Sequence, residues 1–499
     1  MRPAARVAIT TAVFLVLFAT AFTGSWFRDE FYYLACSRRM DWGYVDHPPL
    51  CVAILWLVRH TLGDSLVALR SIAALFTAAS VWLTGSIARR FGAGAFGEAL
   101  AMGAAAVAPA MLAVGTFYSM NVFDLFFWTL AVRLTIEVVD RPTDRGWVAL
   151  GVVLGLGLLN KISMLWLGAG LAGGLLLTPA RALLRTRGPW IAGGIAALFF
   201  APHVLWQVRY GWPTAEFVRE ASRGKMLTNT PLSFVAAQVM NMQPLTLPVW
   251  GAGLLALLAD ARQRRWRLLG IAFLVVAGIL IANRTSRSAY LTPGYPMLLA
   301  AGAVWWESVI RRPAVRAVCL AVLVIGGIAT VPLAVPLLPV DTYVAYSRAL
   351  GVAPGTDEKN ELGRLPQFFA DRQGWDRFVG DVARAWSRLT PEERARAVVF
   401  TGNYGEAGAV ERLGRDAGMV SVSGHNNYWL WGPGDRPADP IVLLTRRPER
   451  AERLFATVEK VGETDCGDCM PYENHLPIYI ARGPKRPLSE VWPQLKHYE

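Results

Sequence analysis

The sequence predicts a polytopic α-helical membrane protein with a small α/β domain at its C-terminal end. Of the 499 residues 54% are hydrophobic, and 19 are Trp. Uncharged or weakly charged apolar runs recur through the first two thirds of the chain, and a run of about 18 residues is long enough to cross a bilayer as a helix. From Val340 onward the composition becomes that of a soluble domain.

The apolar runs define the membrane region, and we predict about 11 transmembrane helices from them. The runs are 7–22, 66–88, 93–114, 121–139, 147–160, 163–179, 188–207, 233–259, 268–283, 290–309 and 315–336. The boundary between the fifth and sixth runs is the weakest, and Asn160-Lys161 is the predicted short turn there. Pro48–Gly63 is apolar but short and is interrupted by Arg59 and His60, which favours a helix at the membrane surface.

Arg clusters in the short links between runs predict the orientation. If the first run leads outward, every link on the cytoplasmic side is Arg-rich, as the positive-inside rule requires. These links contain Arg89-Arg90, Arg141 with Arg145, Arg181–Arg187, Arg262–Arg267 and Arg311–Arg316. The net charge of +13 is explained by these links, so we expect no nucleic-acid partner.

This orientation divides the chain into two domains. Residues 1–339 form the membrane domain, whose first outer loop is 25–65, and residues 340–499 form an extracytoplasmic α/β domain. In the latter, helical spacing at 375–389, 406–413 and 449–461 alternates with strand-like segments at 397–400, 441–444 and 477–481. Such alternation favours a mainly parallel sheet.

The first outer loop contains the most informative stretch. Asp29 and Glu30 stand among aromatic residues just after the first apolar run, and Asp46 follows. Charged groups near hydrocarbon are costly unless they face water, pair or perform chemistry. The stretch therefore predicts a site at the membrane face, with a merely solvated acidic loop as the alternative.

The five cysteines leave their pairing open. Cys36 and Cys51 flank the acidic loop, and Cys466 and Cys469 form a C-x-x-C motif. In an oxidising compartment both pairs could form disulfides. A single C-x-x-C lacks the second ligand pair of a structural zinc site, so we favour a disulfide or thiols for Cys466 and Cys469.

Several motifs together resemble glycosyltransferase family 39, the relatives of protein mannosyltransferases and lipid A aminoarabinose transferases. They are Asp29–Tyr33, Asp46–Leu50, Arg70, Arg89–Gly92, Asn160-Lys161, Trp206, Trp212-Pro213 and Tyr290–Pro296. Three later segments, 403–408, 423–433 and 469–474, are similar to the outer domain of uncharacterised bacterial members. We expect Gly405, Gly408 and Gly424 in these segments to be turn residues.

The resemblance implies the C-type glycosyltransferase fold and a bacterial cytoplasmic membrane enzyme with its active site outside the cytoplasm. It implies a polyprenyl-phosphate sugar donor, an extracytoplasmic acceptor and an inverting transfer. Asp29 matches the acidic residue proposed in the family as general base, a role suited to a positioned carboxylate. Glu30 would support it by orienting or binding the acceptor.

Cations near the site would stabilise the departing lipid phosphate. Lys161 occurs where relatives carry a Lys, and Arg284, Arg287 and Tyr290 belong to an outer link. The alternative for Lys161 is snorkelling from a helix end, which long basic side chains do routinely. For Arg284 and Arg287 the alternative is simple solvation.

One departure from the family concerns the second acidic residue. Many relatives have Thr-Pro-Asp where this chain has Ser119-Met120-Asn121, and Asp124 follows about one turn later. Either Asp124 replaces the missing carboxylate or Asn121 serves as a neutral hydrogen-bonding group. Asp46 and His47 are substrate-binding candidates; two such residues do not make a metal site, so we predict no metal or other cofactor.

Two other functions compete with transfer. A transporter or flippase of lipid-linked sugars would also use carboxylates and cations, but its site would lie near the bilayer centre. Here the charged residues lie at the ends of the predicted helices. A binding module on a membrane anchor would not need about 11 helices.

Overall fold

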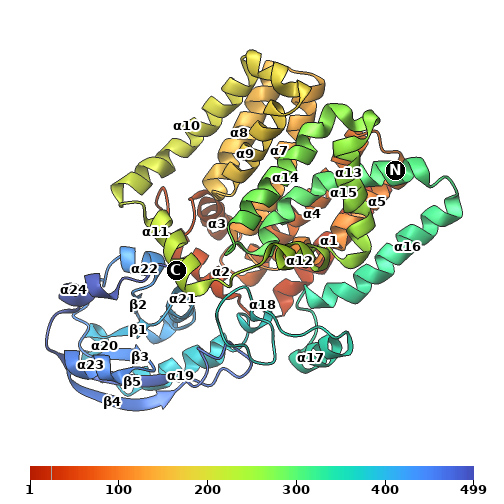
Figure 1. The fold of residues 1–499 in the computed structure, drawn as a ribbon. Coiled ribbons are helices and arrows are strands. Elements are labelled where there is room, and N and C mark those ends of the chain that lie inside the picture. Colours follow the sequence, from red (N-terminus) through yellow and green to blue (C-terminus); the bar gives the residue numbers. More distant parts are fainter. Residues whose placement is uncertain (24) are drawn as a thin grey trace. The chain divides into compact units, whose positions relative to one another are not determined.

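The structure, a computed structural model, describes residues 1–23 and 25–499 (Figure 1). The chain folds into two compact units. Unit 1 comprises Met1–Thr23, His47–Val208 and Thr228–Leu338, and unit 2 comprises residues 25–46, Arg209–Leu227 and Pro339–Glu499. The predicted first outer loop therefore divides between the units at residue 46.

Unit 2 brings together three stretches that are far apart in the sequence. A compact unit with a hydrophobic core of its own cannot be assembled across a bilayer, because irregular backbone does not occur in contact with lipid. Residues 25–46, 209–227 and 339–499 belong to one compact unit, and the Arg distribution predicts that they lie on the same side of the membrane.

Unit 1 is entirely helical in its described part. Its helices are α1 (Pro3–Phe18), α3 (Leu50–Thr61), α4 (Leu66–Arg90), α5 (Ala95–Ala106), α6 (Pro109–Val114), α7 (Met120–Asp140), α8 (Asp144–Asn160), α9 (Met164–Leu176), α10 (Gly188–Arg209), α12 (Pro231–Asn241), α13 (Leu247–Ala259), α14 (Arg267–Ala282), α15 (Tyr295–Val309) and α16 (Pro313–Thr330). Short helices lie between them: η1 (Ala19–Phe22), η2 (Pro179–Arg185), η4 (Pro244–Thr246), η5 (Ala261–Trp266), η6 (Ser288–Gly294) and η7 (Val331–Leu333).

Each predicted apolar run is helical, but not every run is a straight span. Among the described residues, five helices are long and apolar enough to cross a membrane, and two bent pairs raise the number to seven. Helix α8 has 17 residues and α15 has 15, which is short for a span. Helix α7 carries four charged residues. Length and composition thus support fewer spans than the predicted number of about 11.

The helix breaks correct the predicted boundaries in two places and confirm one. The run 233–259 is two helices bent by 95°, where Gln243 has a φ of 71° and precedes a proline. Val107 and Ala108 separate α5 from α6 within the run 93–114. The weakest boundary is as predicted, because α8 ends at Asn160 and Lys161 is extended, with φ −156° and ψ 135°.

Glycine lets the helices of unit 1 pack closely. A Cβ atom on Gly253 of α13 would lie 1.9 Å from the carbonyl oxygen of Leu298 in α15, and one on Gly302 would lie 1.7 Å from that of Val249. Only hydrogen fits at these two crossings. Small residues at helix contacts are typical of membrane proteins, where close packing replaces the hydrophobic effect.

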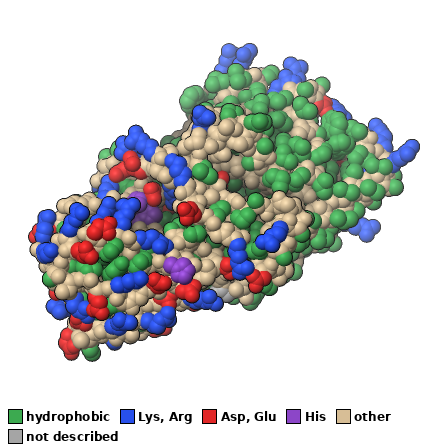
Figure 2. Space-filling model, turned by 60° about the horizontal axis from the view of Figure 1, so that its bottom comes forward, with side chains coloured by type: hydrophobic (Ala, Val, Ile, Leu, Met, Phe, Trp, Pro, Cys, Tyr) green, Lys and Arg blue, Asp and Glu red, His purple; other side chains and the backbone are tan. Residues whose placement is uncertain are grey.

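The surface of unit 1 is strongly apolar (Figure 2). Large side chains on α10, α12 and α16 are exposed, among them Leu198, Leu232 and Ile328, which are 72%, 79% and 70% exposed. An apolar surface of this kind marks a membrane-facing region. Figure 2 shows that charged side chains, in contrast, cover much of unit 2.

Unit 2 is an α/β domain joined by two insertions from the membrane region. The insertions supply α2 (Arg28–Arg38), α11 (Pro213–Glu220) and the π-helix η3 (Ala221–Lys225). The C-terminal stretch supplies α17 (Val340–Ala349), α18 (Gln367–Ala370), α19 (Trp375–Ser387), α20 (Pro391–Arg396), β1 (Val398–Thr401), α21 (Tyr404–Leu413), η8 (Arg415–Ala417), β2 (Ser421–Ser423), α22 (Asn426–Leu430), β3 (Ile441–Leu444), α23 (Pro448–Leu454), β4 (Phe455–Glu463), β5 (Pro477–Pro484), α24 (Leu488–Val491) and η9 (Trp492–Leu495).

The sheet of unit 2 has the strand order β2-β1-β3-β5-β4. Strands β2, β1 and β3 are parallel, with Val399 opposite Ser421 and Val442. Strands β5 and β4 are antiparallel to their neighbours. The sheet is therefore mixed: the predicted parallel pairing holds for β2, β1 and β3, whereas β5 runs in the opposite direction.

The prediction of a helix at 449–461 is wrong in its C-terminal half, since residues 455–463 form the edge strand β4. The apolar residues Phe455, Val458 and Val461 are spaced by three, which imitates a helical period. They are half-buried and the residues between them are exposed, so the pairing with β5 and not the side-chain pattern decides the structure.

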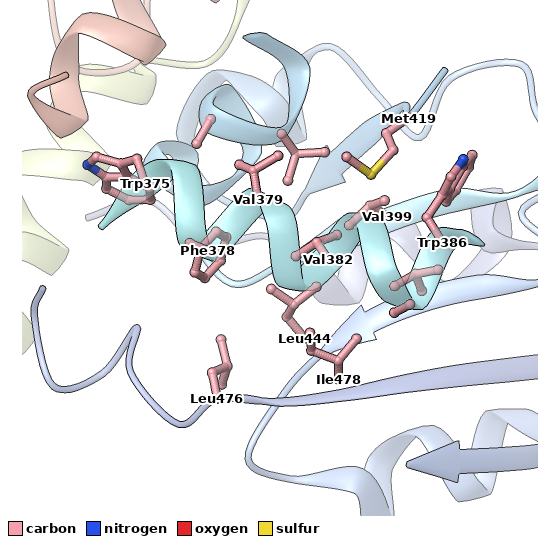
Figure 3. Close-up of a cluster of buried hydrophobic side chains, with 14 of the residues drawn as sticks. Trp375, Phe378, Val379, Val382, Trp386, Val399, Met419, Leu444, Leu476 and Ile478 are labelled. Atoms are coloured by element: carbon pink, nitrogen blue, oxygen red, sulfur yellow. The ribbon is translucent and has the colours of Figure 1, made fainter. Parts of the chain in front are cut away.

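A hydrophobic core on one face of the sheet holds unit 2 together (Figure 3). Trp375, Phe378 and Val382 of α19 pack toward strand residues such as Val399 and Leu444. The core also contains Phe31 of α2, whose ring lies 5.5 Å from that of Trp375. Helix α2, which carries the acidic motif, is thus an integral part of this domain.

Cys466 and Cys469 form a disulfide in unit 2, which is one of the two alternatives that the sequence left open. Both residues are buried and belong to the same core as α19. Cys36 and Cys51 are buried thiols. The disulfide is therefore part of the hydrophobic core of unit 2.

Candidate active site

Helix α2 determines how the two predicted catalytic carboxylates differ. The helix begins at Arg28, and the fully buried Glu30 carboxylate accepts a hydrogen bond from the N–H of Phe27 at 2.9 Å. This contact caps the first turn. The side chain of Asp29 is 30% exposed and stands at the same helix N-terminus, where negative charge is favoured. Asp29 can therefore meet a substrate, whereas Glu30 fixes the helix start.

Asp29 is held by groups of unit 2. The phenol of Tyr404, the first residue of α21, donates a hydrogen bond to Asp29 Oδ1 at 2.8 Å. Arg28 Nε lies 3.7 Å from the same oxygen. A donor and a cation on one oxygen fix the orientation of the carboxylate.

Arg28 links Asp29 to the C-terminal segment. Its guanidinium donates to the hydroxyl of Tyr472 at 2.6 Å and lies 3.5 Å from Asp371 Oδ1. The backbone N–H of Arg28 also donates to the carbonyl of Asp371 at 3.0 Å. The buried cation is thus paired, as buried charges need to be.

Buried carboxyl groups surround this region. Burial raises the pKa of Asp371 to about 6 and that of Glu406 to about 7, and it raises the pKa of Glu473 well above its ordinary value. Glu406 accepts hydrogen bonds from the N–H of Gly402 and the side-chain amide of Asn403, both at 2.8 Å. These bonds hold the first turn of α21, which begins with Tyr404.

The raised pKa values predict that unit 2 loses stability as the pH rises from 5 to 8. An unfolded glutamate ionises near pH 4.3, whereas folded Glu406 keeps its proton until about pH 7. The folded state binds more protons in this window, so the free energy of unfolding falls with rising pH. The loss from Glu406 is at most about 3 kcal/mol.

Glu406→Gln should therefore flatten the pH dependence of the thermal midpoint. The measurement is thermal unfolding of the purified protein in detergent at pH 5 and pH 8. Glu361→Gln, at an exposed position, is the matched control and should keep the wild-type slope. An unchanged slope in Glu406→Gln would contradict the assignment.

Glycines allow α21 to approach α2. A Cβ atom on Gly405 would lie 2.2 Å from Cγ of Arg28, and one on Gly408 would lie 2.8 Å from Cβ of Phe31. Both glycines are inside a helix, and neither has a positive φ. The prediction that they are turn residues is wrong, because their role is close contact between helices.

Asp46 is the second acidic residue of the loop that contacts this region. It accepts a hydrogen bond from the hydroxyl of Tyr32 at 2.9 Å. The same hydroxyl lies 2.9 Å from Oδ1 of Asn427, which in turn accepts the N–H of Val45 at 2.7 Å. Segment 423–433 thus fixes the end of the acidic loop.

Unit 1 contains a second group of predicted site residues. Lys161 Nζ donates to Asn121 Oδ1 at 2.9 Å and lies 3.4 Å from Asp124 Oδ2. Its ammonium group is 4.7 Å from the ring centre of Tyr290, and Ser163 donates to Asp124 Oδ1 at 2.7 Å. The structure therefore brings together four predicted residues from three separate links.

Lys161 does not snorkel. Its side chain is only 10% exposed and that of Asp124 is 3% exposed. The pair joins α7 to the extended residue between α8 and α9. Both residues that could stand in for the family's second carboxylate, Asp124 and Asn121, contact the lysine.

The other predicted residues lie outside this group of four. Arg284 is exposed, and its carbonyl accepts the N–H of Asn229 at 2.7 Å. Arg287 precedes η6, and its carbonyl accepts the N–H of Tyr290 at 3.1 Å. His47 is buried, with Nδ1 3.0 Å from the carbonyl of Pro48. In the described residues no group of three His, Cys, Asp or Glu side chains could hold a metal ion.

Sequence reasoning missed the partners of the predicted residues. Arg28, Tyr404, Tyr472 and Ser163 make direct contacts to predicted carboxylates or to one another. For Tyr404 and Tyr472 the sequence did contain an indication, because both lie in segments that are similar to family members. Nothing in those segments indicated that they pack against α2.

The fold defines the class of protein. The chain matches the crystal structure of ArnT from Cupriavidus metallidurans bound to undecaprenyl phosphate over 97% of this chain and 100% of that chain, with a TM-score of 0.62 and 15% identity. The arabinofuranosyltransferase AftD from mycobacteria matches over 98% of this chain and 40% of that chain, with a TM-score of 0.52 and 14% identity. The chain is a membrane protein with the C-type glycosyltransferase fold.

Within this class, residues 46–206 match the family model of dolichyl-phosphate-mannose-protein mannosyltransferase. The predicted family resemblance is confirmed there. The lipid A galacturonosyltransferase RgtD from Rhizobium johnstonii is 26% identical over 226 residues, which are 44% of this chain and 47% of that protein. The chain thus spans about half the length of this curated relative. The family match includes Asn121, Asp124 and Lys161, whereas Asp29 and Glu30 precede it.

Proposed function

We propose that this protein transfers a sugar from a polyprenyl phosphate to an acceptor hydroxyl on the outer face of the bacterial cytoplasmic membrane. The fold is shared with ArnT, whose crystal structure holds undecaprenyl phosphate. The partly matching relative RgtD is a lipid A galacturonosyltransferase. A lipid, a protein or a cell-envelope glycan can supply the acceptor hydroxyl, and the sugar is a hexose or a pentose.

The reaction needs a base for the acceptor and stabilisation for the leaving group. The carboxylate of Asp29 takes the proton of the acceptor hydroxyl as its oxygen forms a bond to the anomeric carbon of the sugar. The bond between that carbon and the phosphate oxygen breaks, and the lipid phosphate leaves with the electron pair. Attack opposite the leaving group in one step inverts the anomeric configuration.

The observation that carries this proposal is the exposure of Asp29 and the contacts that orient it. It is a partly exposed carboxylate on a rigid helix start, oriented by Tyr404 and Arg28. A general base must be accessible and held in place, and Asp29 meets both conditions. Glu30, buried in its cap, supports Asp29 by fixing the first turn of α2.

Lys161 supplies the cation for the phosphate. A lipid phosphate near the ammonium group would share it with Asp124 and Asn121. Placed in a site with little water, such a cation stabilises the charge that develops on the leaving oxygen. Asn121, Asp124 and Tyr290 hold the lysine in place, and Arg284 and Arg287 add positive charge to the segment that leads to Tyr290.

Reconstitution tests the reaction itself. Purified protein in liposomes, supplied with a labelled polyprenyl-phosphate sugar and a cell-envelope acceptor extract, should form a labelled product that is stable to mild acid. A transporter would move the lipid-linked sugar between leaflets and form no glycosidic product. Transport without product in the wild type would therefore overturn the proposal.

The orientation gives a separate prediction. Single cysteines introduced as Met40→Cys and Glu361→Cys should both react with a membrane-impermeant maleimide in whole cells, because both positions lie in unit 2, which the proposed orientation puts outside the cytoplasm. Arg145→Cys, in an Arg-rich link, is the control and should react only after the membrane is opened. Mass spectrometry of the labelled peptide gives the readout. Protection of residue 361 in intact cells would reverse the orientation.

A further inference from the structure

We infer that Tyr404 is a positioning residue for Asp29, so that the C-terminal domain completes the site that activates the acceptor. This inference rests on the proposed function. It assigns to the late segments 403–408, 423–433 and 469–474 a common task, which is to fix the first turn of α2.

The first step in the argument is the contact itself. The hydroxyl of Tyr404 donates to Asp29 Oδ1 at 2.8 Å. Burial raises the pKa of Tyr404 well above its ordinary value, so the phenol keeps its proton and remains a donor. With Oδ1 held, the direction of Oδ2 is also fixed, because the carboxylate is planar.

The second step is that the ring of Tyr404 is itself fixed on three sides. Its centre is 4.6 Å from the ring centre of Tyr32 and 5.0 Å from that of His425. The guanidinium of Arg28 lies 5.4 Å from it. An aromatic ring enclosed in this way has few rotamers, so its hydroxyl is a rigid donor.

His425 holds the backbone of Tyr404. Its Nδ1 accepts the N–H of Tyr404 at 3.2 Å, and its Nε2 lies 2.9 Å from a backbone oxygen of Glu499. Burial lowers the pKa of His425 well below its ordinary value. The ring is therefore neutral, with the proton on Nε2, which is the tautomer that these two contacts require.

The start of α21 is fixed as well. Asn403 Oδ1 accepts the N–H groups of Gly405 at 2.8 Å and Glu406 at 3.0 Å, which caps the helix. Gly405 leaves room for the side chain of Arg28, as described above. Helix α21 therefore presents Tyr404 to Asp29 only because residue 405 has no side chain.

Tyr428 provides a matched control within the same domain. Its hydroxyl donates to a carboxylate, Glu411 Oε2, at 2.9 Å, and the residue is 3% exposed compared with 8% for Tyr404. Tyr428→Phe and Tyr404→Phe thus remove the same chemical contact from two similar environments. Of these two contacts, that of Tyr404 is to the proposed base and that of Tyr428 is to Glu411.

The test is steady-state kinetics of the reconstituted protein with both variants. Tyr404→Phe should lower kcat by about 10- to 10²-fold with KM for donor and acceptor unchanged, since a misplaced catalytic group costs this much. Tyr428→Phe should lower the thermal midpoint to a similar extent and keep wild-type kcat. In an Asp29→Asn background, Tyr404→Phe should have less than a twofold further effect, because the two residues act as one unit.

A second measurement does not need turnover. Thermal midpoints of a double-mutant cycle measure whether Tyr404 and Asp29 contact each other. Tyr404→Phe should lower the midpoint less in an Asp29→Ala background than in wild type, whereas Tyr428→Phe should lower it equally in both backgrounds.

The outcomes separate the two proposals. Wild-type kcat in Tyr404→Phe, together with an inactive Asp29→Asn, would overturn the inference and leave the proposed function in place. If wild-type protein forms no glycosidic product, the proposed function fails, and the double-mutant cycle alone decides the contact. An equal fall of the thermal midpoint for Tyr404→Phe in the wild-type and Asp29→Ala backgrounds would then overturn the inference.

Discussion

Asp29→Asn should abolish most sugar transfer while leaving the protein folded. The substitution keeps the size of the side chain and an oxygen that can accept the Tyr404 hydrogen bond, but it removes basicity. Loss of a general base costs about 10²–10⁴-fold in rate. The measurement is product formation by reconstituted variant and wild type at equal protein, with thermal midpoints recorded beside it.

Glu30→Gln is the natural comparison for this result. Because Glu30 is buried and caps α2, its substitution should reduce stability more than kcat. A cap contributes about 0.5–2 kcal/mol. Asp29→Asn with wild-type turnover would remove Asp29 from the catalytic role, and Asp46 and Asp124 would be the next carboxylates to test.

Lys161→Met should reduce kcat/KM for the lipid donor by about 10²-fold, the effect expected when one group that stabilises a developing negative charge is lost. Met fills a similar volume without the charge. The acceptor KM should change little, because the lysine acts on the donor phosphate. Initial rates at varied donor and fixed acceptor concentrations give the two constants.

A structural explanation for this loss needs its own control, since Lys161→Met leaves Asp124 buried without its cation. Removing one partner of a buried ion pair costs about 3–5 kcal/mol. The double variant Lys161→Met/Asp124→Asn has no unpaired charge, so it should regain stability yet keep the weak donor use. Recovery of donor use in the double variant would show that the lysine serves the fold alone.

For the group of residues around Lys161, the sequence predicted the lysine and its turn, but only the fold determined which residues contact it. Asn160-Lys161 was recognisable as a turn because it interrupts an overlong apolar run, and the resemblance pointed to the lysine. That Asn121, Asp124 and Tyr290 all contact it could not be predicted, because these contacts depend on how α7, α9 and η6 pack. The snorkelling alternative failed for the same reason, since burial is a property of neighbouring helices.

The helix count shows a limit of hydropathy. Apolar runs identify segments that prefer the membrane, but a run does not reveal bends. The run 233–259 bends by 95° at Gln243-Pro244. A proline in the sequence indicates that a bend can occur there, but it does not give the size of the bend. The mixed sheet of unit 2 escaped prediction for a related reason, because the direction of β5 and β4 is set by pairing between distant segments.

The sequence by itself determined the class of this protein. Apolar runs, Arg-rich links and the motifs around Asp29 and Lys161 are formed by residues close together in the chain, so they can be recognised without the tertiary structure. The tertiary structure alone decided that residues 25–46 belong to the C-terminal domain and that Tyr404 holds Asp29 across 375 positions of sequence. No pattern in the sequence indicates a hydrogen bond between residues so far apart. It exists because Gly405 and Gly408 let two helices approach closely enough for a phenol to reach a carboxylate.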